Sequence, residues 1–323
     1  PPAGGPVVGR ETNGTFYTFL FGCPNYNDRM PGKPPLLNPI LRWVLAALII
    51  ANVASEMVYT LLPVYLLQLG ATPAQIGLVF TGGGLFIALL QFFGGWVSDR
   101  LGRLRAIAVG SVIASLGYLG FWLAPSWPWI LPALCLEFVS TALVGPSFSA
   151  LIADQSTPEN RGRTFGVMRG FLMLVTVLGP LAGGLLTGSR GFKPMLALAF
   201  FLYLSAALLR IWLARRFPPS PVEAAPAKAS SFSANLRVLL SLLAGGGVLT
   251  WILITDGGRD VAFNLSADLL PVYLSSIAGL TIAQVGLFRA LRGGASVLST
   301  LGAGWLVDRL GESKTIVAGF VLQ

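Results

Sequence analysis

The chain contains three short sequence stretches twice, in the same order. They are LLPVYL at 61–66 and 269–274, AQIGL and AQVGL at 74–78 and 283–287, and GWVSDRLG and GWLVDRLG at 95–102 and 304–311. The second copies begin 208 or 209 residues after the first ones. A fixed internal period indicates a duplicated unit, and periods of about 20–50 residues indicate solenoids or propellers. The period here is far longer, so we expect one bundle of helices that is built twice.

Composition places this duplicated unit in a membrane. Of the 323 residues, 54% are hydrophobic and 11% are charged, whereas charged residues make up about 25% of a soluble domain. So few charges cannot cover a globule with a wetted surface. Histidine, the commonest metal ligand, is absent, and 2 cysteines are too few for a disulfide framework or a zinc site. We therefore predict an all-α membrane protein without a cofactor.

Several segments are apolar over enough residues to cross a bilayer, whose core of about 30 Å needs about 20 helical residues. They lie at 41–67, 74–97, 104–124, 127–152, 164–187, 194–214, 248–275, 281–306 and 313–323. The first copy holds six of them and the second fewer than three complete ones. The pattern predicts a C-terminally truncated protein with about nine of twelve helices.

The domain boundaries follow from these segments. Residues 1–38 are rich in Pro, Gly and Asn without periodicity, which is typical of disorder. We predict a disordered cytoplasmic tail at 1–38, a six-helix N-terminal bundle at 39–214, a cytoplasmic linker with room for a surface helix at 215–247, and a partial C-terminal bundle at 248–323.

Basic residues gather on one side of the predicted membrane. Lys and Arg cluster around 100–105, 161–163, 215–237 and 309–314, and the loops on the other side are nearly uncharged. Because Lys and Arg collect on the cytoplasmic side, we predict a multi-pass protein of the cell inner (plasma) membrane with a cytoplasmic N-terminus. The net charge of +9 is then a topology signal, and no nucleic-acid partner is expected.

The repeated loop at 95–102 carries residue types suited to a tight reversal between helices. Gly95 lets its helix approach a neighbour closely, Asp99 can accept from free N–H groups at a helix N-terminus, and Gly102 supplies a positive φ. We predict that both copies of this loop form a gate on the cytoplasmic side. The gate residues are Gly95, Asp99, Arg100, Gly102 and Arg103 in the first copy and Gly304, Asp308, Arg309 and Gly311 in the second.

These two loops resemble the signature of the major facilitator superfamily of secondary transporters, which lies between helices 2 and 3, and its weaker counterpart between helices 8 and 9. A third loop, DQSTPENRGRTFG at 154–166, is similar to the family's acidic and then Arg-Gly loop after helix 4. The resemblance covers about residues 39–323. It implies two bundles related by a pseudo-twofold axis, which rock about a central site. It also implies a small-molecule substrate, a monomer in the lipid bilayer, and no enzymatic activity.

The fifth segment carries a glycine–proline cluster that resembles a motif of proton-coupled exporters in this superfamily. Pro180 removes one backbone hydrogen bond and bends a helix, and glycines allow helices to cross closely. We predict a hinge at Gly179, Pro180, Gly183 and Gly184. An ordinary kinked helix with a small-residue face is the alternative.

Charged residues also lie deep within the predicted helices. They are Glu56, Glu137, Asp256, Arg259, Asp260, Arg289 and Arg292. A charge at the bilayer centre costs at least about 2.5–3.5 kcal/mol on insertion scales, so it must be paired or face water. We expect this set to line the substrate and proton pathway, with Asp256 and Asp260 paired to Arg289 or Arg292. Purely structural ion pairing is the alternative.

Glu56 and Glu137 have no arginine close in sequence. A carboxyl group removed from water exchanges protons closer to neutral pH, so we hypothesise that one of the two carries a coupling proton. A neutral glutamic acid hydrogen-bonded between helices is the alternative. Asp268, near the outer end of the seventh segment, is expected to be exposed or to belong to a gate.

Together, these features predict a secondary transporter that uses a proton gradient to export drug-like or amphipathic compounds. Uptake of a sugar, an organic anion or another metabolite is the alternative within transport. A membrane-embedded enzyme would need a nucleophile–base pair or a metal-binding acidic cluster, and the sequence offers neither. A receptor on the same fold would bind a ligand without moving it.

Overall fold

The computed structural model describes residues 37–157, 160–217 and 267–310, together with positions 241, 245, 250, 251 and 255. The chain divides into the units Pro1–Leu36 and Leu37–Gln323, and all that follows concerns the second unit. The predicted tail up to position 36 and most of the predicted linker lie outside the described residues. So do four predicted site residues, namely Asp256, Arg259, Asp260 and Gly311.

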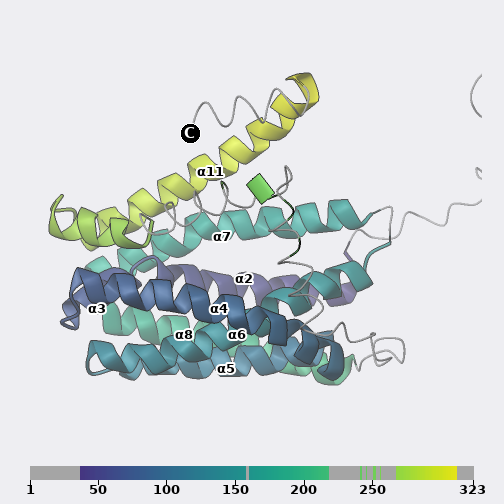
Figure 1. Cartoon of the computed structure of the whole chain (residues 1–323), viewed down its shortest axis with the longest axis horizontal. Coiled ribbons are helices and arrows are strands. Elements are labelled where there is room, and N and C mark those ends of the chain that lie inside the picture. Colours follow the sequence, from purple (N-terminus) through teal and green to yellow (C-terminus); the bar gives the residue numbers. More distant parts are fainter. Residues whose placement is uncertain are drawn as a thin grey trace, which may run out of the picture. The chain divides into compact units, whose positions relative to one another are not determined.

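The described part of the chain is helical and contains no strand. Its elements are α2 Pro39–Tyr59, α3 Leu62–Gln68, α4 Pro73–Leu101, α5 Arg103–Leu123, the short 3-10 helix Trp127–Trp129, α6 Ile130–Asp154, α7 Arg161–Arg190, α8 Phe192–Arg216 and α11 Ile282–Leu310 (Figure 1). Residues 267–276 are helical as well. Five of the described helices are long and apolar enough to cross a membrane: α2, α5, α6 with its 3-10 turn, α7 and α8. The prediction of an all-α membrane protein is confirmed.

The two copies of the repeat begin their second helix with the same local structure. At the start of α4, the Thr72 hydroxyl accepts from the Gln75 N–H at 3.3 Å and the Gln75 side chain accepts from the Thr72 N–H at 2.8 Å. At the start of α11, Thr281 and Gln284 form the same two bonds at 3.3 and 2.9 Å. Such a capping box satisfies N–H groups that lack a partner within the helix. The duplication is therefore present in the hydrogen bonding as well as in the sequence.

The first predicted segment, 41–67, is divided in the structure. α2 ends at Tyr59 and α3 begins at Leu62, with Pro63 in its first turn. Proline fits the first turn of a helix because no N–H is needed there, whereas further along it removes a backbone bond. Pro63 thus starts a new short helix. In the second copy, Pro271 lies inside the described helical residues 267–276.

Close packing, and not apolarity alone, holds these helices together, since lipid tails are as apolar as leucine. α2 packs against α7 and α8, α5 against α6 and α8, α4 against α6, and α7 against α11. Figure 1 shows α7 lying between α2 and α11. Small residues permit the contacts: a Cβ added to Gly117 of α5 would lie 2.8 Å from the Ala133 carbonyl oxygen of α6. Tyr118 and Phe121 are fully buried in this core.

Candidate functional site between the two repeats

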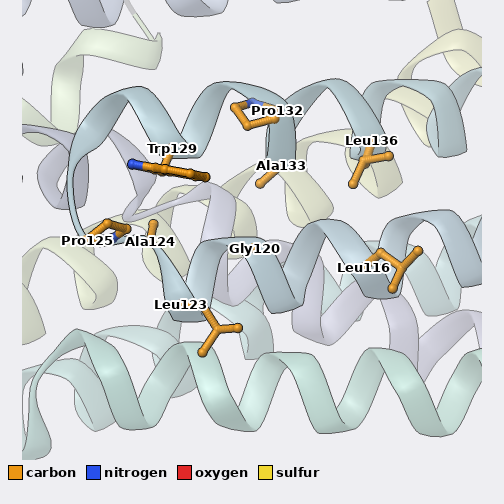
Figure 2. Close-up of a pocket in the computed structure, with 9 residues that line it drawn as sticks. All are labelled: Leu116, Gly120, Leu123, Ala124, Pro125, Trp129, Pro132, Ala133 and Leu136. Carbon is orange, nitrogen blue, oxygen red and sulfur yellow. The ribbon is translucent and has the colours of Figure 1, made fainter.

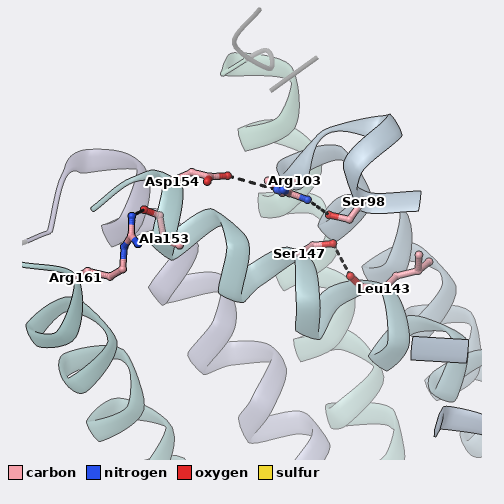
Figure 3. Close-up of polar contacts among 7 residues, drawn as sticks. All are labelled: Ser98, Arg103, Leu143, Ser147, Ala153, Asp154 and Arg161. Carbon is pink, nitrogen blue, oxygen red and sulfur yellow. Dashed lines mark hydrogen bonds and ion pairs between the residues drawn. The ribbon is translucent and has the colours of Figure 1, made fainter. Parts of the chain in front are cut away.

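The loop between α4 and α5 is tied to the end of α6 on the arginine-rich side. Arg103 Nε lies 3.4 Å from Asp154 Oδ2, and Arg103 Nη1 donates to Ser98 Oγ at 3.2 Å (Figure 3). Arg161, at the start of α7, donates to the Ala153 carbonyl oxygen at 3.2 Å. The two arginine-containing loops of the first copy therefore converge on the last turn of α6.

The described gate residues lie near the end of α4, in the turn from α4 to α5, and near the end of α11. Gly102 has φ +85°, as predicted for a tight reversal. The close approach expected at Gly95 lies one residue earlier: among the described atoms a Cβ on Gly95 would meet nothing within 4 Å, whereas a Cβ on Gly94 would overlap the backbone of Ala142 in α6. One residue turns a helix by about 100°, which moves the contact from one face to the next. Arg100 is exposed in the last turn of α4.

In the second copy, Gly304, Asp308 and Arg309 belong to α11, where Arg309 is exposed in the last turn. The side chains of Asp99 and Asp308 lie outside the described part of the structure. The gate role of both loops stays a prediction.

We expect the Arg103–Asp154 pair to contribute little to stability. Its side chains are 24% and 40% exposed, and exposed pairs contribute about 0.2–1 kcal/mol. A double-mutant cycle with Arg103→Ala and Asp154→Ala isolates the pair from the other contacts of Arg103. Thermal unfolding of the four proteins in detergent measures the coupling free energy. A value near 3 kcal/mol would contradict this reading of the loop.

A second polar cluster joins helices of both repeat copies. Arg289 of α11 lies within electrostatic range of Glu56 of α2 and of Asp268 in the helical residues 267–276. Its guanidinium also donates to the Ala267 carbonyl oxygen. All three charged side chains are partly buried. Glu56, which has no arginine near it in sequence, therefore has one near it in space.

The glycine–proline cluster of α7 lies where α7 packs against α2 and α11, next to this charge cluster. A Cβ on Gly179 would overlap the Cβ of Glu56, and one on Gly183 would lie 2.8 Å from the Met57 carbonyl oxygen. The two glycines therefore allow α2 to pack closely against α7. On the α11 side, a Cβ on Gly184 would lie 2.7 Å from Gly286 Cα. α7 is one continuous helix through Pro180. The cluster holds α2 and α11 on two faces of α7, and its role as a hinge stays a prediction.

The second predicted proton carrier, Glu137, lies elsewhere, inside the first six helices. It is 6% exposed. Its carboxylate accepts from the Tyr59 hydroxyl and, at 3.2 Å, from the Thr141 hydroxyl. Tyr118 donates to Ser55 Oγ at 2.9 Å. Tyr118 also lies within electrostatic range of both Glu137 and Glu56, so one buried tyrosine senses both acids.

This network continues to an arginine that sequence reasoning missed. Tyr203 stacks on Tyr118 with ring centroids 4.6 Å apart and lies within electrostatic range of Arg210. Arg210, 4% exposed, donates from Nη1 to Ser111 Oγ at 2.6 Å. It lies five residues before Arg215 in α8, about 7–8 Å deeper along the helix. The apolar residues on both sides of Arg210 were the available signal that it lies in the core.

The remaining predicted residues are placed as follows. Arg292 is partly buried on α11, about one turn after Arg289. Arg169 of α7, which is not one of the predicted pathway residues, is exposed. Because Asp256 and Asp260 lie outside the described residues, their predicted pairing with Arg289 or Arg292 stays a prediction.

An apolar groove lies apart from all of these charges. It has a volume of about 350 Å³ between α5 and α6, and its residues include Leu116, Leu123, Trp129, Pro132 and Leu136 (Figure 2). Leu116, Leu123 and Trp129 are 52%, 63% and 62% exposed. Substrate sites combine an apolar wall with a few convergent polar groups, and none of the described residues that line this groove is charged. We therefore place the candidate site at the Glu56–Arg289–Asp268 cluster.

The sequence profile described as the Major Facilitator Superfamily matches residues 44–323. The chain belongs to this superfamily. As a member of the superfamily it is a membrane transporter and not an enzyme.

Among curated relatives, the multidrug resistance protein MdtG of Citrobacter koseri is 27% identical over 284 residues, which cover 85% of this chain and 68% of that protein. MdtG of Escherichia fergusonii is 29% identical over 302 residues, with coverages of 88% and 70%.

Solved structures support the superfamily fold. A peptide transporter POT in complex with sulfate superposes with a TM-score of 0.62 at 15% identity, covering 84% of this chain and 69% of that one. A D-xylose–proton symporter superposes with a TM-score of 0.60 at 16% identity, with coverages of 84% and 68%. At such low identity the superfamily likeness concerns the fold alone.

Proposed function

We propose that this superfamily member exports drug-like or amphipathic compounds in exchange for protons. The relatives named multidrug resistance proteins support export as the direction and drug-like compounds as the substrate class. The arginines at the ends of α4, α8 and α11 and at the starts of α5 and α7 favour a cytoplasmic N-terminus in the inner (plasma) membrane, by the positive-inside rule.

One observation supports the proposed proton coupling: Glu56 of the first repeat copy lies within electrostatic range of Arg289 of the second. Ionised Glu56 attracts Arg289 and so favours the arrangement in which α2 and α11 lie on two faces of α7. A proton on Glu56 removes this attraction and leaves Asp268 as the acid near Arg289. Alternating access moves one bundle against the other. A proton that weakens the attraction between Glu56 and Arg289 therefore favours one of the two arrangements of the bundles, open to the inside or open to the outside. Glu137, whose carboxylate accepts from Tyr59 and Thr141, is the alternative carrier of the proton.

The proposal is tested with the product of the complete gene in proteoliposomes, using a fluorescent lipophilic cation as substrate. We expect the wild type to move the dye against its gradient when a pH gradient is imposed. We expect Glu56→Gln with Glu137→Gln to lose this dependence, because neither side chain can then carry a proton, while dye exchange down a gradient persists.

Asp154→Asn is the matched control, because it neutralises an exposed acid outside the bilayer. Full proton dependence in the doubly substituted protein would refute the assignment of Glu56 and Glu137. Dye movement in the direction of uptake would refute export.

A second candidate function is uptake of an organic anion. It is favoured by Arg289 and Arg292, two partly buried arginines about one turn apart on α11. A screen of labelled anions and cations, with and without a pH gradient, separates the two candidates by the charge of the solutes that are moved.

A further inference from the structure

A second groove lies between α5 and α8, two helices that pack side by side (Figure 1). Its volume is about 680 Å³. Its walls are apolar except for one arginine from each helix, Arg105 and Arg215. α5 begins at Arg103 and α8 ends at Arg216, so both arginines stand at the same end of the groove, on the arginine-rich side of the protein.

Neither arginine has a polar partner among the described residues. Both are exposed, and among the described residues neither forms a hydrogen bond or an ion pair. Arg103, two residues before Arg105, shows the contrast because it is paired with Asp154. Two arginines thus line one end of an apolar groove without a counter-charge from the described residues.

The apolar part of the groove has the length of most of one lipid leaflet. Arg105, Ala108 and Val112 are spaced i, i+3 and i+7, so they form one stripe along α5. From Arg105 to Val112 this stripe rises about 10 Å, while half of a bilayer core is about 15 Å. Ala108 and, on α8, Ala214 have short side chains, which leave the space that forms the groove.

We propose that this groove binds an anionic phospholipid of the leaflet on the arginine-rich side. The phosphate lies between Arg105 and Arg215, and an acyl chain follows the stripe past Ala108 and Ala214. Arginine matches phosphate because its planar fork donates two parallel hydrogen bonds. Basic pockets between membrane helices on this side suit anionic lipid headgroups. A free phosphate ion would pair with both arginines, but it would not cover the apolar side chains of the stripe.

The test is lipid binding to the purified complete protein, followed by native mass spectrometry. Phosphatidylglycerol is titrated as the anionic probe and phosphatidylethanolamine as the zwitterionic one. We expect preferential binding of phosphatidylglycerol. Each of Arg105→Gln and Arg215→Gln is expected to weaken its binding about fivefold, the equivalent of about 1 kcal/mol for each basic residue near an anionic surface. Together they are expected to weaken it about 25-fold.

Arg163→Gln is the matched control and is expected to change nothing. Arg163 is also exposed, on the same side, but it lies on α7 away from the groove. Ala214→Leu fills the groove and keeps both arginines, so it is expected to weaken phosphatidylglycerol binding as well. Unchanged elution and melting temperature establish that each variant is folded.

The proposal is overturned if Arg163→Gln weakens binding as much as Arg105→Gln, or if Ala214→Leu binds like the wild type. Displacement of phosphatidylglycerol by millimolar inorganic phosphate would also overturn it, because the site would then recognise a free anion. None of these results depends on which solute the protein transports, so the lipid site and the proposed export succeed or fail separately.

Discussion

Gly286→Ala is expected to destabilise the protein and to reduce transport at least tenfold. The added Cβ would lie 2.6 Å from Gly184 Cα and 2.6 Å from the Pro180 carbonyl oxygen. Both are backbone atoms, so α7 and α11 must move apart. Alanine is favoured over glycine in a helix by about 1 kcal/mol, but overpacking of this kind costs about 1–3 kcal/mol or more. The steric cost therefore outweighs the gain in helix propensity.

Gly294→Ala on the same helix is the matched control. A Cβ at Gly294 would meet nothing within 4 Å, so this substitution is expected to leave transport unchanged and to stabilise the protein slightly. Thermal unfolding and dye transport in proteoliposomes measure both effects. Gly184→Ala adds a Cβ to the same contact from α7. The double variant is therefore expected to lose less stability than the sum of the two single losses. Wild-type stability of Gly286→Ala would show that α7 and α11 do not cross at this point.

The elements of the fold that depend on local sequence were predictable. Thr72 and Gln75 stand three residues apart before an apolar run, as Thr281 and Gln284 do, and both pairs form the capping box that this spacing indicates. Gly102 adopts the positive φ expected of it. These features need only a few neighbouring residues, so a single sequence specifies them.

The neighbours of each helix face were not predictable in the same way. Gly94, and not Gly95, approaches α6, because the rotation of a helix about its axis depends on packing against all its neighbours at once. For the same reason the sequence could not show that Glu56 lies within electrostatic range of Arg289, since the two residues are more than 200 positions apart. Arg210 could be taken for a membrane-surface arginine until its bond to Ser111 placed it in the core.

Arg289→Met is expected to destabilise the protein by about 2 kcal/mol and to abolish coupled transport. Removal of one partner of a fully buried ion pair costs about 3–5 kcal/mol, and the smaller figure follows because Arg289 is only partly buried. Without it, Glu56 and Asp268 lose the cation within their electrostatic range. Methionine keeps much of the volume of the arginine stem, so the loss reports charge and hydrogen bonding more than packing.

Neutralisation of the two acids is expected to restore the stability that Arg289→Met removes, because the unpaired charges are the cause of the loss. The triple variant with Glu56→Gln and Asp268→Asn should therefore melt near the wild-type temperature and still fail to couple transport to a pH gradient. Arg169→Met, at an exposed arginine of α7, is the control and is expected to stay within about 0.5 kcal/mol of the wild type. If Arg289→Met melts like this control, Arg289 does not hold the two repeats together. Proton binding at Glu56 would then have no contact through which to move them.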